Sequence, residues 1–221
     1  MQRIRNKSKP ALATLNLPGL YLITPDGWSC GRLQARLKPM LRRGIAMLQY
    51  RDKRATAGQR LATAQMLASL CRAYQTPLII NDDVTLARQV QAAGVHLGRD
   101  DNDPRRAREQ LGADAIIGSS CYNDLALAAR MRSAGADYLA FGSVFASATK
   151  PTAQRCGLEI LQQARSLGLP LVAIGGIRLD NAAQTLHAGA DMLAVISDVF
   201  DAADPGRRVQ GYQRLFAQPS A

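Results

Sequence analysis

The chain repeats one pattern of apolar and polar residues along most of its length. Short runs of consecutive apolar residues alternate with longer segments in which apolar residues recur every three or four positions. Continuous apolar runs are typical of parallel strands covered on both faces, and the longer period is typical of amphipathic helices. The runs predict strands at residues 20–24, 46–51, 78–81, 95–98, 115–119, 138–144, 171–175 and 192–196. The segments between them predict helices, among them 58–74, 84–93, 124–134 and 158–167.

Glycines mark many of the predicted helix ends, where a left-handed residue commonly stops a helix. They are Gly44, Gly94, Gly112, Gly135, Gly168 and Gly189. The repeat gives eight strand–helix units in about 200 residues, the number that closes a (β/α)8 barrel. We predict a single (β/α)8 TIM barrel over residues 19–216, preceded by a flexible basic tail at residues 1–18. An open doubly wound sheet is the alternative, but the G-x-G-x-x-G fingerprint is missing after the first strand.

The composition narrows the class of protein. With 47% hydrophobic and 20% charged residues, the chain has the composition of a soluble α/β protein. No apolar stretch approaches the roughly 18 residues that a membrane span needs, so we expect no membrane partner. The four cysteines lie far apart, without metal-type pairs, which favours reduced thiols and a cytoplasmic location. These cysteines are Cys30, Cys71, Cys121 and Cys156.

The net charge of +11 raises the question of nucleic-acid binding. The basic residues are spread along the chain, however, and few aromatic residues accompany them for stacking on bases. The densest group, at residues 99–108, has aspartates interleaved with its arginines, as in a solvated helix start. We therefore expect no nucleic-acid partner, and a basic balance equally suits an enzyme of small phosphorylated substrates.

Polar or glycine residues follow seven consecutive predicted strands, where a barrel carries its chemistry. The second strand ends in Gln49, Arg51 and Lys53, which share one side because side chains on a strand alternate. Two cations that point the same way at a strand end indicate a bound anion. Lys150, after the sixth strand, could surround the same anion.

Asp82 and Asp101 end adjacent strands, so their carboxylates can meet. Two carboxylates with room for water suit Mg²⁺, which prefers oxygen ligands and usually bridges to substrate phosphates. The alternative is a pair of helix caps, and Asp83 and Asp103 are also good helix N-caps.

The seventh and eighth units predict a second anion site. Gly176 follows the seventh strand and Ser197 follows the eighth, where barrels commonly offer backbone N–H groups to a phosphate. The segment 146–157, after the sixth strand, is longer than the usual loop and holds several hydroxyl residues. A mobile lid is the functional interpretation, and a disordered insertion is the alternative.

Three further reactive residues favour structural roles. His96 lies within the fourth strand and His187 late in a helix, and no His/Cys cluster suggests zinc. Cys121 lies near the rim, but no partner histidine is identifiable, so a packed thiol is the better interpretation.

Taken in order, these motifs resemble the thiamine-phosphate synthase family over roughly residues 20–200. "QYRDK" is similar to the family's Q-x-R-x-K, "NDD" to its N-D, and "HLGRDD" to its H-x-G-x-x-D. "GSS" is similar to its G-x-S, "SATK" to its T-x-T-K, and "IGGI" with "VIS" to its phosphate-binding pair. Where the family often has Pro-Thr, this chain has Ala146-Ser147, which keeps the hydroxyl but suggests a looser lid.

The resemblance implies a reaction that joins 4-amino-2-methyl-5-(diphosphooxymethyl)pyrimidine to 4-methyl-5-(2-phosphooxyethyl)thiazole and yields thiamine phosphate and diphosphate. It implies a dissociative mechanism, a Mg²⁺ cofactor held by Asp82 and Asp101, and small-molecule substrates, and it is compatible with a homodimer. The implied ligands of the pyrimidine diphosphate are Gln49, Tyr50, Arg51, Asp52, Lys53, Asn81, Ser120 and Lys150. Among these, the implied catalytic residues are Arg51, Lys53, Ser120 and Lys150. The implied ligands of the thiazole phosphate are Ser147, Ala148, Thr149, Gly176, Ile196 and Ser197.

Two other functions remain open at this point. A thiazole tautomerase of the same superfamily would use the barrel for proton transfer, but it has no diphosphate for so many cations to hold. A non-catalytic barrel that binds nucleic acid would instead show a steep salt dependence of binding.

Overall fold

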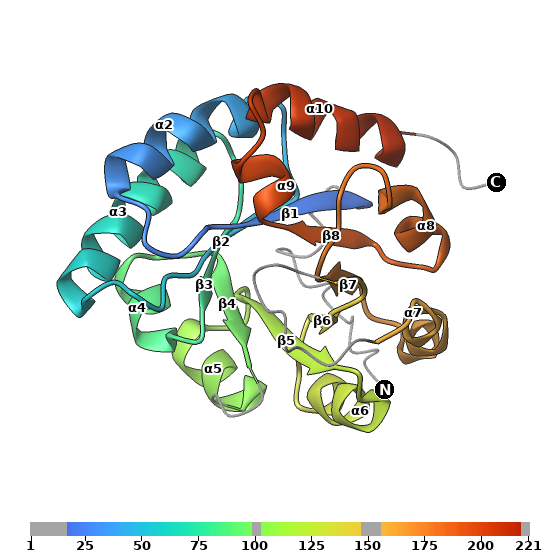
Figure 1. The fold of residues 1–221 in the computed structure, drawn as a ribbon. Coiled ribbons are helices and arrows are strands. Elements are labelled where there is room, and N and C mark those ends of the chain that lie inside the picture. Colours follow the sequence, from blue (N-terminus) through green and yellow to red (C-terminus); the bar gives the residue numbers. More distant parts are fainter. Residues whose placement is uncertain (1–16, 99–102, 147–155, 218–221) are drawn as a thin grey trace, which may run out of the picture.

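The computed structural model describes residues 17–98, 103–146 and 156–217, and these residues form a closed barrel. Its parallel strands follow one another in chain order, and the first pairs with the last, so no strand edge is left open. Figure 1 shows the helices as an outer ring around the strands. The strands are β1 (Gly19–Ile23), β2 (Met47–Tyr50), β3 (Leu78–Asn81), β4 (Gly94–Leu97), β5 (Ile116–Tyr122), β6 (Tyr138–Phe141), β7 (Leu171–Ile174) and β8 (Met192–Val195). The prediction of a single (β/α)8 barrel is confirmed.

The helices begin where polar side chains cap them. Asp83, Asp103, Asp124 and Asp204 each accept a backbone N–H from the first turn of the helix that follows. Such caps satisfy amide groups that have no partner within the helix. The helices are α2 (Cys30–Leu41), α3 (Ala57–Ala73), α4 (Val84–Gln89), α5 (Pro104–Leu111), α6 (Leu125–Ser133), α7 (Glu159–Ala164), α8 (Ala182–His187), α9 (Ser197–Phe200) and α10 (Pro205–Phe216), with a 3₁₀ turn at Arg165–Leu167.

Two hydrophobic layers result from the alternation of side chains along the strands. One layer fills the barrel interior, and the other lies between the strands and the helices. On β2, Met47 belongs to the inner layer, and Leu48 and Tyr50 belong to the outer one. The inner layer contains Tyr21, Ile23, Ala46, Met47, Ile79, Ile116, Tyr138, Ala140, Val172, Met192 and Ala194.

One predicted helix end is wrong, and the cause is close packing. Gly94 lies in β4, and α4 already ends at Gln89, after which Gln91 takes the left-handed conformation with φ 53°. A Cβ atom on Gly94 would lie 1.8 Å from the carbonyl oxygen of Ile116 on β5. Glycine is therefore needed there for strand packing. The other five predicted helix-end glycines have positive φ, as expected.

A buried ion pair ties α5 to the amino-terminal end of the barrel. Arg108 on α5 contacts Asp137, which directly precedes β6, with Nη2 2.5 Å from Oδ2. The same carboxylate oxygen accepts the N–H of Ile117 on β5 at 2.8 Å. Asp137 is only 4% exposed, so its charge depends on these partners.

No helix within the described ranges combines the length and the apolar character that crossing a membrane requires. The predicted tail falls almost entirely in residues 1–16, outside the described part of the chain.

Candidate functional site

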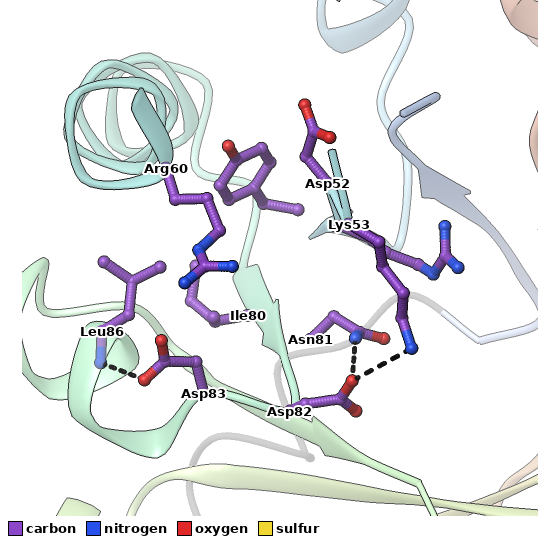
Figure 2. A pocket seen from close by; sticks show the side chains of 10 residues that line it. Asp52, Lys53, Arg60, Ile80, Asn81, Asp82, Asp83 and Leu86 are labelled. Carbon is purple, nitrogen blue, oxygen red and sulfur yellow. Dashed lines mark hydrogen bonds and ion pairs between the residues drawn. The ribbon is translucent and has the colours of Figure 1, made fainter. Parts of the chain in front are cut away.

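A cleft of about 320 Å³ opens at the carboxyl ends of β2 and β3. Figure 2 shows its lining side chains, which come from the ends of β2 and β3, from the loops that follow these strands and from the first turns of α3 and α4. The cleft combines cations, carboxylates and an apolar wall. Its lining residues are Tyr50, Arg51, Asp52, Lys53, Arg60, Ile80, Asn81, Asp82, Asp83 and Leu86.

Arg51 is held in the site by an aspartate that sequence reasoning missed. Asp26, in the loop after β1, contacts Arg51 with Oδ2 2.7 Å from Nη1, and its other oxygen accepts the N–H of Lys53 at 3.0 Å. Thr24 joins the same two loops, because its hydroxyl donates to the carbonyl of Arg51 and accepts from its N–H. The β1 loop therefore orients the first cation of the rim.

The structure gives Asp52 a role in the loop. Its Oδ1 accepts the N–H groups of Arg54 and Ala55, and its Oδ2 accepts the N–H of Gly27 at 3.1 Å. The carboxylate thus faces backbone donors, and a carboxylate would repel a diphosphate. Tyr50 also differs from the other predicted ligands, since its ring lies on the outer face of β2 and is buried, which raises the pKa of its phenol.

Lys53, Asn81 and Asp82 meet at the mouth of the cleft (Figure 2). The Asn81 amide donates to Oδ2 of Asp82 at 2.5 Å, and Nζ of Lys53 lies 3.8 Å from the same oxygen. Asp82 has φ 63°, a conformation that non-glycine residues seldom adopt and that is concentrated at functional sites. Its N–H donates to the carbonyl of His96, which links the ends of β3 and β4.

The donor set at this mouth fits a magnesium ion. The carboxylate of Asp82 and the amide oxygen of Asn81 are hard oxygen ligands at a strand end, and Asp83, not Asp82, caps α4. Asp101, the second predicted ligand, lies outside the described residues. Within the described ranges no group of three acidic, histidine or cysteine residues gathers around one point.

The second predicted anion site lies across the rim, at β7 and β8. Gly176 has φ 63°, and a Cβ atom there would lie 2.2 Å from the carbonyl oxygen of Ala146. The turn after β7 is thus packed against the start of the loop after β6. Ile196 precedes α9, which begins at Ser197 next to the barrel mouth (Figure 1). Ser147, Ala148, Thr149 and Lys150, and with them most of the predicted lid, lie outside the described residues.

Five polar side chains form a continuous chain of hydrogen bonds inside the barrel. Gln49 Nε2 donates to the hydroxyl of Tyr21 at 2.7 Å, and this hydroxyl lies 2.8 Å from that of Tyr138. The Tyr138 hydroxyl lies 3.0 Å from Nδ1 of His96, and Nε2 of His96 lies 2.9 Å from the hydroxyl of Ser120. We call this set the interior chain. It joins two predicted pyrimidine ligands through three side chains to which the sequence assigned no role in the site.

Sequence reasoning also overlooked Arg60, whose guanidinium lines the cleft from α3. A helix position one turn inside α3 gives no strand-end signal, so only the packing of α3 beside β2 and β3 exposes it. Cys121 is fully buried, and burial raises the pKa of its thiol to about 12, which agrees with a packed thiol. His187 is the last residue of α8 and is exposed.

A closed (β/α)8 barrel with cations, a carboxylate and an amide at the carboxyl ends of its strands defines an enzyme that acts on anionic substrates. The comparisons with known proteins specify it further. A family model described as thiamine monophosphate synthase matches residues 20–199. The chain belongs to this family, and the prediction of a transferase in thiamine biosynthesis is confirmed.

Similar proteins support the assignment over nearly the whole chain. A thiamine-phosphate synthase of Azoarcus sp. is 54% identical over 200 residues, which cover 90% of this chain and 97% of that protein. The one of Methylobacillus flagellatus is 52% identical over 200 residues, 90% of this chain and 96% of the other. A solved thiamine phosphate pyrophosphorylase from Pyrococcus furiosus has a TM-score of 0.78 at 34% identity and covers 89% of this chain and 94% of its own.

Proposed function

We propose that this chain couples the aminopyrimidine diphosphate with the thiazole phosphate to give thiamine phosphate and diphosphate. The observation that carries the proposal is the meeting of Arg51, Lys53, Asn81 and Asp82 at one cleft, oriented by Asp26. The cleft of about 320 Å³ is of the size of small-molecule sites. We place the enzyme in the cytoplasm, where its four free thiols remain reduced.

The reaction is dissociative in this proposal. The carbon–oxygen bond to the diphosphate breaks first, the pyrimidine-methyl cation forms, and the lone pair of the thiazole nitrogen attacks it. Negative charge accumulates on the departing diphosphate, so the cations of Arg51 and Lys53, together with Lys150 as the resemblance implies, would stabilise the transition state more than the bound substrate. No general base is needed, because the thiazole nitrogen already carries its lone pair.

Asp82 and Asp101 would hold the Mg²⁺ ion, with Asn81 beside them. When bound, Mg²⁺ supplies neutralisation of charge on the phosphoryl oxygens. Across the rim, we assign the thiazole phosphate to Ser147, Ala148, Thr149, Gly176, Ile196 and Ser197. Two separate anion sites keep the two substrates apart until the diphosphate leaves.

The test measures diphosphate release from the full chain. We expect release only when both substrates and Mg²⁺ are present, and its loss when EDTA removes the metal. Asp82→Asn should lose most of the activity and keep the fold, because charge stabilisation by a bound metal is worth several kcal/mol. Asp114 is an exposed aspartate before β5, so Asp114→Asn is the matched control and should keep full activity.

Four results would contradict this function or a part of it. Release from the pyrimidine diphosphate alone would exclude coupling, and full activity of Asp82→Asn in EDTA would exclude the metal role. Conversion of a thiazole tautomer without any release of diphosphate would favour a tautomerase. Tight, steeply salt-dependent binding of DNA together with indifference to thiazole phosphate would favour a nucleic-acid-binding barrel.

A further inference from the structure

The interior chain is built into the barrel and is rigid. A Cβ atom on Gly118 would lie 1.9 Å from Cζ of Tyr138, so only glycine at this position leaves room for the tyrosine ring. The Tyr138 ring stacks on His96 with the ring centroids 5.6 Å apart, and Tyr21 meets it edge-on at 5.9 Å. Tyr21 and Tyr138 are fully buried, as are the contacts between them. These side chains therefore have little freedom to seek other partners.

With the amide nitrogen of Gln49 toward Tyr21, each bond in the interior chain takes one direction. Burial raises the pKa of Tyr21 and of Tyr138, so each phenol keeps its one proton. The hydroxyl of Tyr21 already accepts from Gln49, so its own proton goes to Tyr138, and the proton of Tyr138 goes to Nδ1 of His96. His96 then carries its proton on Nε2 and donates it to the hydroxyl of Ser120. With Gln49 in this orientation, the reversal of any single bond leaves a buried donor without an acceptor.

The two ends of the interior chain consequently present opposite groups. Gln49 uses its amide N–H toward Tyr21, and within the described residues its carbonyl oxygen accepts no hydrogen bond. Ser120 accepts from His96, so its hydroxyl proton is left to donate. One end of the chain thus offers an acceptor, and the other offers a donor.

We propose that Tyr21, Tyr138 and His96 are positioning residues that set Gln49 as acceptor and Ser120 as donor, and thereby select an aminopyrimidine over an oxopyrimidine. The proposal rests on the proposed function, in which both end residues bind the pyrimidine. A 4-aminopyrimidine offers an exocyclic N–H donor and unprotonated ring nitrogens as acceptors, which complements this pair. In the 4-oxo form the exocyclic group becomes an acceptor and the ring nitrogen beside it carries a proton.

The interior chain has one other fully bonded state, in which all donors and acceptors are exchanged. In that state Gln49 would accept from Tyr21, His96 would carry its proton on Nδ1, and Ser120 would donate to His96. The ends would then suit the oxo form. Since no bond can reverse alone without orphaning a buried proton, the two ends change together or not at all.

A first experiment reads the direction of the chain without any substrate. The protein has two histidines, so ¹⁵N-histidine labelling gives few resonances, and His187→Gln assigns them. Protonated and unprotonated ring nitrogens differ clearly in ¹⁵N shift. We expect neutral His96 with its proton on Nε2. A proton on Nδ1, or protons on both nitrogens, would overturn the proposal whatever reaction the enzyme catalyses.

A second experiment measures selectivity. For the wild-type chain and Tyr138→Phe, kcat/KM is measured with the aminopyrimidine diphosphate and its 4-oxo analogue. We expect the amino-to-oxo ratio to fall by about tenfold or more in the variant, because neither end is then held in one direction. The KM for thiazole phosphate should stay unchanged. Tyr74→Phe, at the far end of α3, is the matched control.

The outcomes separate this proposal from the proposed function. A wild-type chain that does not couple the substrates contradicts the function. A wild-type chain that couples them, with an unchanged ratio in Tyr138→Phe, contradicts the positioning role alone. If Tyr138→Phe fails to fold, Tyr21→Phe interrupts the same chain at its neighbour and must lower the ratio likewise.

Discussion

At the scale of single residues, Arg51 shows how an ion pair can orient a guanidinium group and still leave some of its N–H donors for a substrate. Its partner Asp26 contacts one guanidinium nitrogen at 2.7 Å, and the other N–H donors of the fork remain for a substrate. The pair is partly exposed, so its main contribution is orientation and not stability.

The replacement Asp26→Asn tests this orientation. We expect kcat for coupling to fall about tenfold, because a charge-assisted bond is worth roughly 1.5–3 kcal/mol. The orientation of Arg51 matters most in the transition state, when the diphosphate leaves. Steady-state kinetics with each substrate varied in turn measure it. The KM for thiazole phosphate should not change, and Asp114→Asn again provides the control. An unchanged kcat would show that Asp26 serves the loop alone.

At this scale the sequence predicted that three residues of the second strand share one side, but not the partners that they meet. Alternation placed Gln49 and Arg51 on the same side of their strand, and the structure shows that Gln49 points into the barrel, where it meets Tyr21. Asp52 was grouped with the ligands because it lies among them in sequence, yet its carboxylate turns to three backbone N–H groups. Asp26 was missed because it comes from a different loop, 25 residues before Arg51, and only barrel closure brings the two together.

At the scale of elements, two consecutive loops pack against each other at the β6 and β7 side of the rim. The loop after β6 hydrogen-bonds to β7 and to the turn that follows it, through Val144 to Ile174 and Phe145 to Gly175. Gly176 then lies directly against Ala146. The proposed thiazole phosphate site therefore depends on two consecutive loops keeping their register.

Gly176→Ala should disturb that register. A side chain there meets the Ala146 carbonyl and takes a left-handed conformation, which costs about 1–2 kcal/mol. We expect the free energy of unfolding to drop by about this amount and the KM for thiazole phosphate to rise about tenfold. Gly58→Ala, with open space around it on α3, should leave the KM unchanged and should not lower the free energy of unfolding, because alanine favours a helix. Equal KM values for both variants would remove Gly176 from the thiazole site.

The order and type of the elements could be predicted from the sequence, since continuous apolar runs and helical periods are local signals. Their ends were harder to predict. Predicted helix 84–93 stops at Gln89, because Gly94 is required by the close approach of β5. Such an approach involves residues far apart in sequence, which a local pattern cannot show. For the same reason, the contact between Gly118 and Tyr138 was not foreseen.

For the whole molecule, closure of the barrel depends on its ends as well as its core. Arg108 and Asp137 link α5, β5 and β6 at the end opposite the site. Removal of one partner leaves a buried charge uncompensated, which costs about 3 kcal/mol. We expect Arg108→Met to lose this much stability in urea unfolding, with kcat preserved. Arg106→Met, exposed on the same helix, should stay within about 0.5 kcal/mol of wild type. Equal midpoints for the two variants would contradict a structural role for the pair.

The overall charge of +11 distinguished poorly between functions before the fold was known. Within the described residues, the cations that carry the proposed function are few and gathered at one cleft, while others serve structure, as Arg108 does. The homodimer with which the resemblance is compatible stays a prediction, as does the flexible tail at residues 1–18.

The interior chain also bears on how this barrel can evolve. Its members are hydrogen-bonded one after another, so a substitution at one of them changes the free-energy effect of substitutions at the others. Double-mutant cycles along the chain should therefore be strongly non-additive. Replacement of Gln49 by a side chain that cannot donate would leave the hydroxyl of Tyr21 without its donor unless every bond of the chain reversed. Each position of the chain therefore constrains the others, and this epistasis would hold the substrate preference constant while the helices around the barrel drift.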